Sequence, residues 1–189
     1  MTIFEYVTAA LLIILGLGVT ELLNDAIGLF RDRHERRPEW IALAWACIIF
    51  AHQMQFLWAI FELSAIVESW SAGEFLLALS LVLLLFAAGA LIIPRPAAEG
   101  AWDPWRRFQQ NGRWSVIALA CYSLLAFTAN PLFYGVAFFT AGNIINLVLA
   151  GLLLGIFFLP TKRLWSIATV LYAFFAAYEI VRLSPSTYP

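Results

Sequence analysis

The sequence is poor in charge and in the residues that build metal sites. Charged residues make up 12% of the 189 positions, about half the ~25% of an ordinary soluble domain, whereas apolar residues make up 63%. Only two histidines are present, His34 and His52. The stretch from Trp40 to His52 alone would measure about 18 Å as a helix, so the two imidazoles cannot share an ion within one subunit. We therefore expect no metal site and no resident cofactor; a haem held by one axial histidine is the alternative that these residues leave open.

Other classes of protein are excluded by residues that the sequence lacks. The two cysteines, Cys47 and Cys121, lie in apolar runs and outside any CxxC pair, which is typical of small packing residues. No lysine falls inside an apolar run, so a Schiff-base pigment site is excluded. The net charge is −1 and no basic stripe with interleaved aromatics is present, so we expect no nucleic-acid partner.

What the chain does have is long apolar runs. A helix needs about 20 apolar residues to cross a bilayer, and helix is the state that satisfies every backbone group within the segment. We predict an all-α, polytopic membrane protein: one domain over residues 1–189 with six transmembrane helices. The expected spans are 4–30, 40–63, 75–93, 114–129, 132–159 and 164–183.

Helix-terminal residues separate these runs. Pro38 and Glu39 precede the second span, and Ser71 with Glu74 has the pattern of a capping box for the third. Asn130-Pro131 predicts a tight turn between the fourth and fifth spans, and Pro160 predicts another before the sixth.

Lysine and arginine predict the orientation. Ten of the 11 basic residues fall in the loops after the first, third and fifth spans, and only Arg182 falls on the other side. Positive residues favour the cytoplasmic side, so we predict an uncleaved first span and both termini outside. The longest loop, 94–113, carries Trp105 and Phe108 beside Arg106 and Arg107. It is predicted either to lie as an amphipathic segment on the cytoplasmic leaflet or to be irregular.

Polar side chains inside the predicted spans are the candidate functional residues. Glu21, Asn24 and Asp25 share one helical face with Gly28, and a carboxylate at such depth costs about 2–3 kcal/mol, so it should face protein or water. His52 has the side chain best suited to reversible protonation near neutrality. These residues predict a polar path running from the cytoplasmic end to the outside: Glu21, Asn24, Asp25, His52, Gln55, Asn143, Asn146, Tyr172, Glu62 and Glu179.

A structural interpretation competes with that path. Asn, Gln and His often join membrane helices by hydrogen bonds worth about 0.6–2 kcal/mol, which favours such a role for Gln53, Gln55, Asn143 and Asn146. For Glu62 and Glu179, which lie near water, we expect solvated positions at the rim of the bundle. Gly151 and Gly155 form a small-xxx-small motif, which indicates close helix packing within the chain or between subunits.

One resemblance can be stated from residues 18–23 (GVTELL), 29–33 (LFRDR) and 53–59 (QMQFLWA). The first half of the chain resembles a group of small multi-pass bacterial membrane proteins with an arginine-rich first loop and a Gln-x-Gln-aromatic-x-Trp-Ala box in the second helix. The group has no established activity. The resemblance implies a bacterial inner membrane and nothing about a substrate.

The sequence thus favours a small inner-membrane channel or transporter for a proton, ion or small polar solute. We expect the lipid bilayer and a homo-oligomer or larger membrane complex as its partners. A non-catalytic accessory or scaffold subunit is the alternative. A membrane enzyme acting on a lipid or quinone comes third, because no acid/base constellation is visible.

Overall fold

The computed structural model describes residues 3–34, 38–67, 70–94 and 103–183, and every regular element in them is helical. The side chains of a few helix-end residues, including Glu179, fall outside the description. The elements are α1 (Ile3–Arg31), α2 (Trp40–Ile66), α3 (Ala72–Ile92), α4 (Pro104–Arg107), the π-helical turn η1 (Phe108–Gly112), α5 (Arg113–Tyr134), α6 (Ala141–Phe157) and α7 (Lys162–Leu183).

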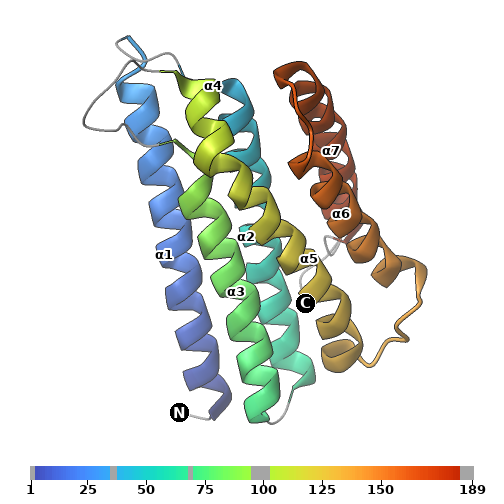
Figure 1. The fold of residues 1–189 in the computed structure, drawn as a ribbon. Coiled ribbons are helices and arrows are strands. Elements are labelled where there is room, and N and C mark those ends of the chain that lie inside the picture. Colours follow the sequence, from blue (N-terminus) through green and yellow to red (C-terminus); the bar gives the residue numbers. More distant parts are fainter. Residues whose placement is uncertain (1–2, 35–37, 68–69, 95–102, 184–189) are drawn as a thin grey trace.

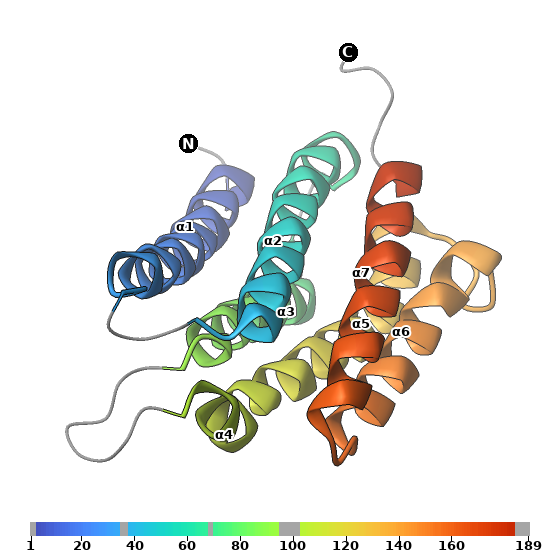
Figure 2. The ribbon, with the colours of Figure 1, turned by 90° about the horizontal axis from the view of Figure 1, so that it is seen from above.

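The six long helices form two layers. Seen along the helices, α1, α2 and α7 make one row and α3, α5 and α6 make the other (Figure 2). Helix α3 packs on α1 and α5, α5 packs on α6, and α2 lies against α1, α3, α5 and α7. Helix α7 is joined to the rest mainly through α2.

Within the part of the chain that the structure describes, four helices are long and apolar enough to cross a membrane: Glu5–Arg31, Trp40–Leu63, Ala72–Ile92 and Pro104–Tyr134. Helix α6 is apolar but only 17 residues long. Large apolar side chains such as Leu17 and Phe174 face outward, as lipid would require. The all-α prediction is confirmed, and the long apolar helices are compatible with a membrane protein.

Several predicted helix ends are confirmed. Ser71 Oγ accepts a hydrogen bond from Glu74 N at 3.2 Å, and Ser71 N donates to Glu74 Oε2 at 2.7 Å, so the predicted capping box starts α3. The chain also breaks between α6 and α7 around Pro160, as expected.

The predicted turn at Asn130-Pro131 is wrong. Helix α5 continues through Pro131 to Tyr134 and ends at Gly135, which has a left-handed φ of 63°. Helix α6 begins only at Ala141, so the fourth span is longer than predicted and the fifth is shorter. A proline inside a helix removes one hydrogen bond, and the helix persists where another donor replaces the missing N–H.

The loop predicted at 94–113 is helical from Pro104 onward in its described part. Residues 104–112 form α4 and η1, which lead directly into α5 (Figure 1). Phe108 is fully buried, and its ring packs edge-on against Trp165 of α7 with centroids 5.2 Å apart. The structure therefore places this segment against the bundle, and its contact with a membrane surface stays a prediction.

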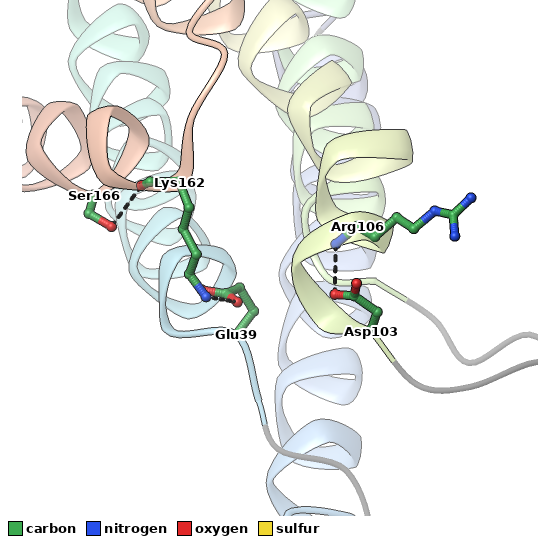
Figure 3. A network of polar contacts seen from close by, with 5 residues as sticks. All are labelled: Glu39, Asp103, Arg106, Lys162 and Ser166. Carbon is green, nitrogen blue, oxygen red and sulfur yellow. Dashed lines mark hydrogen bonds and ion pairs between the residues drawn. The ribbon is translucent and has the colours of Figure 1, made fainter.

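The described basic loop residues gather at one end of the bundle, where α1 ends and α2, α4 and α7 begin (Figure 1). There the buried carboxylate of Glu39 accepts a hydrogen bond from Lys162 Nζ at 2.7 Å (Figure 3). This ion pair joins Glu39, the residue just before α2, to Lys162, the first residue of α7, which is 123 positions later in the sequence.

Helices α1, α2 and α3 approach closely around one glutamine. A Cβ added to Gly18 of α1 would lie 3.2 Å from Gln53 Nε2, and one added to Gly89 of α3 would lie 3.4 Å from the same atom. Gln53 of α2 is fully buried, and neither atom of its amide has a hydrogen-bond partner in the described part of the chain. The two glycines leave the room that this side chain fills.

Candidate functional site

A cavity of about 360 Å³ lies among α2, α5 and α6, with Ala176 of α7 contributing to its wall. Its inner residues are buried, including His52, Phe56 and Ser123. The residues at the other end, Glu62 and Gly142, are exposed. Glu62 lies ten positions after His52, so this wall measures about 15 Å along α2. The cavity thus runs from the middle of the bundle to the end opposite the basic loops.

Half of the predicted path residues meet in this cavity. His52, Gln55 and Glu62 line it from one face of α2, as their helical spacing predicts. Asn143 and Asn146 line it from α6. The structure therefore brings together the middle and outer parts of the predicted set.

The remaining path residues lie elsewhere. Glu21, Asn24 and Asp25 belong to α1, which packs on α2 and α3, and none of them lines the cavity. Their side chains are half-exposed or exposed, so the α1 acids occupy a separate part of the molecule. Tyr172 is buried in α7 but is not part of the cavity wall. The side chain of Glu179 lies outside the described residues.

His52 forms the most unusual part of the wall. Its side chain is 5% exposed, and neither ring nitrogen has a hydrogen-bond partner in the described residues. Gln55 lies nearby on the next turn but not in hydrogen-bonding geometry. A buried imidazole normally satisfies its N–H, so an imidazole that lines a cavity without a protein partner is a candidate to hydrogen-bond a bound solute.

Asn143, in contrast, is fully engaged by the protein. Its Nδ2 donates to the carbonyl of Phe127 at 2.9 Å and to that of Phe138 at 3.0 Å. Its Oδ1 accepts from Asn130 Nδ2 at 3.2 Å and, more weakly, from Asn146 Nδ2 at 3.5 Å. The Phe127 carbonyl is the one that Pro131, four residues later, cannot bond. Asn143 therefore supplies the donor that keeps α5 helical, which agrees with the structural interpretation of this residue.

Aromatic packing closes the bundle beyond His52. Trp45 is completely buried, donates from Nε1 to Thr169 Oγ1 of α7 at 3.0 Å, and packs against the Tyr172 ring with centroids 5.0 Å apart. Trp165 and Phe108 continue this packing toward the basic end. No cavity-lining residue comes from this part of the described structure, so the cavity opens at one end of the bundle only.

Several residues of the cavity wall were not among the candidates predicted from the sequence. Tyr122, Asn130 and Tyr134 line the cavity from α5, and Trp58 lines it from α2. The sequence predicted a turn at Asn130, so it did not predict that the stretch from Tyr122 to Tyr134 belongs to one helix. The spacing of Tyr122, Ala126 and Asn130 at four residues marks a common helical face and was the available signal.

The two glycines of the small-xxx-small motif lie on the outer face of α6. Gly151 and Gly155 are exposed, and a Cβ added to either would meet nothing within 4 Å. They make no close helix crossing within the described chain. Their role in a contact between subunits stays a prediction.

Among the described residues, no group of three or more His, Cys, Asp or Glu side chains is placed to hold a metal ion. The fold and the site together define an all-α protein with long apolar helices, compatible with a membrane protein, and a cavity that opens at one end and is lined by both apolar and polar side chains. Comparison with known protein families, curated proteins and solved structures finds no match for this chain. The resemblance described above therefore rests on the quoted residues alone.

Proposed function

We propose that this protein is a small membrane transporter that binds a polar solute, ion or proton in the cavity among α2, α5 and α6. The observation that carries the proposal is the buried His52, which lines a cavity of about 360 Å³ and whose ring nitrogens have no partner in the described residues. This volume lies at the lower end of ligand pockets, which favours a small solute.

A carrier fits this geometry better than an open pore. The cavity ends at the packing of Trp45, Thr169 and Tyr172, and the α1 acids lie outside its wall. A solute that enters beside Glu62 can reach the middle of the bundle and no further in this conformation. Passage then requires a second conformation in which the basic end opens, as in alternating access.

The proposal includes the topology that the sequence predicts: six spans, both termini outside, and a bacterial inner membrane. The gathering of basic residues at one end of the bundle supports this orientation. Helix α6 is about 25 Å long, slightly less than the ~30 Å hydrocarbon layer, and apolar Phe158 and Leu159 follow it. In this topology the cavity opens to the periplasm.

The direct test is solute flux into proteoliposomes. Purified protein is reconstituted, and uptake of protons, monovalent ions and small polar solutes is followed by a pH dye and by light scattering. We expect flux of at least one of these above that of empty liposomes. Ala59→Phe, which fills the cavity from α2, should abolish it, whereas Ala177→Phe on the exposed face of α7 should not. Flux equal to that of empty liposomes for every solute would overturn the proposal.

An accessory subunit of a larger membrane complex is the second candidate. The outward face of α6, with Gly151 and Gly155 open, is the observation that favours it. Measuring the size of the complex after gentle solubilisation distinguishes an accessory subunit from a transporter. A hetero-complex that breaks on Gly151→Leu, together with no flux by the isolated chain, would favour the accessory role. Nothing in the described residues favours the lipid- or quinone-acting enzyme.

A further inference from the structure

The charge of the cavity wall restricts what can bind there. Glu62 is the one carboxylate among the lining residues, and no Lys or Arg is among them in the described part of the chain. An anion entering the cavity would meet a like charge and no counter-charge. A cation would meet an opposite charge at the mouth and neutral oxygen acceptors beyond it.

The walls near Glu62 are aromatic. Trp58 lies one helical turn before Glu62 on α2, and Tyr134 lines the same cavity from α5. Phe56 and Tyr122 line the deeper part. Aromatic faces attract ammonium groups, most strongly where water is partly excluded.

The apolar share of this wall argues against a bare metal ion. Alkali and alkaline-earth ions need several oxygen ligands in a tight shell, and one carboxylate among aromatic rings does not provide it. An alkylammonium ion has a large, weakly hydrated surface that suits aromatic walls. The amides of Gln55 and Asn146 and the ring of His52 lie farther in, where they can hydrogen-bond the polar remainder of such a molecule.

We propose that the cavity binds a small organic ammonium ion, with the cationic group held by Glu62, Trp58 and Tyr134. This inference rests on the proposed function and names its class of solute. Glu62 supplies the opposite charge, the two rings supply the cation–π surface, and the inner polar residues orient the rest of the solute.

The test compares choline with 3,3-dimethyl-1-butanol, which has the same shape and no charge. Binding to the purified full-length protein in nanodiscs is measured by titration calorimetry. We expect choline to bind at least tenfold more tightly than the alcohol, equivalent to ~1.4 kcal/mol. Glu62→Gln and Trp58→Leu should each weaken choline binding about tenfold without weakening the alcohol to the same extent. Glu5→Gln, which removes an exposed acid at the same end of the bundle but outside the cavity, is the matched control.

Equal binding of the two molecules, or no binding of choline, would overturn this inference. So would a loss of choline binding that is the same in Glu5→Gln as in Glu62→Gln. None of these results affects the flux experiment, in which Ala59→Phe is judged with protons, ions and neutral solutes. If Ala59→Phe abolishes flux but the protein shows no preference for choline, the proposed transport function is supported and the proposed ammonium ligand is wrong.

Discussion

Among single residues, Asn143 and Pro131 depend on each other across two helices. The proline leaves the Phe127 carbonyl without its backbone donor, and Asn143 Nδ2 bonds that carbonyl at 2.9 Å. Neither residue is informative alone: Asn-Pro is an ordinary turn signal, and an Asn inside a span is equally compatible with helix packing and with solute binding. Only the fold shows that each one explains the other.

A double-mutant cycle tests this pairing. Asn143→Ala should lower the free energy of unfolding by about 1–2 kcal/mol, since it removes the donor to the part-buried Phe127 carbonyl and to the Phe138 carbonyl. In a Pro131→Ala background, residue 131 regains an N–H for the Phe127 carbonyl. The loss should then be smaller by about 0.5–1 kcal/mol. Denaturant unfolding in detergent micelles measures both values.

Asn146→Ala serves as the control for this cycle. It removes a single long hydrogen bond of 3.5 Å, so its effect should stay below about 0.5 kcal/mol. Equal losses for Asn143→Ala in the two backgrounds would show that Asn143 does not replace the missing proline donor.

For whole helices, the sequence predicted which helices exist more accurately than where each helix ends. Local signals succeed where a side chain bonds its own helix, as Ser71 and Glu74 do. The boundary between α5 and α6 was mispredicted because the residue that keeps α5 helical lies 12 positions after Pro131, in the next helix. The burial of Phe108 was missed for a similar reason, since its partner Trp165 belongs to α7.

The attachment of α7 to α2 gives a prediction for these helices. Glu39 is 4% exposed, and its second oxygen, Oε1, has no partner in the described residues, so Lys162 is its principal compensation. Lys162→Gln should lower the free energy of unfolding by about 1–2 kcal/mol. This is less than for a fully buried pair, because the Lys162 side chain is 48% exposed. Thermal unfolding in micelles measures the change.

Two further variants make that result specific. Arg163→Gln removes the neighbouring exposed charge and should change stability little. Glu39→Gln combined with Lys162→Gln removes both charges and should recover most of the loss. A double variant as unstable as Lys162→Gln alone would mean that the buried carboxylate is not the cause.

For the molecule as a whole, the cavity divides the bundle into a polar half and a packed half. The sequence predicted the polar half through His52, Gln55, Glu62, Asn143 and Asn146, because helical spacing relates residues on one helix. It joined them to the acids of α1 because nothing in a sequence tells which helices are neighbours. The fold places α1 against α2 and α3, away from α5 and α6.

Thiol labelling tests this division. With Cys47 and Cys121 replaced by Ala, Ala59→Cys lines the cavity and Ala46→Cys lies in the packed half of the same helix. A membrane-impermeant maleimide added to right-side-out vesicles should modify Ala59→Cys and leave Ala46→Cys unmodified. Modification of both would show water crossing the packed half, and labelling from the cytoplasmic side alone would reverse the proposed orientation.

The hydrogen bond between Trp45 and Thr169 has a consequence for the rate of transport. If solute leaves at the basic end, that bond must break and α7 must separate from α2, which is a collective rearrangement on the order of microseconds to milliseconds. Each cycle then delivers one cavity's contents, so uptake should saturate with solute concentration, and electrical recordings should lack the discrete current steps of an open pore.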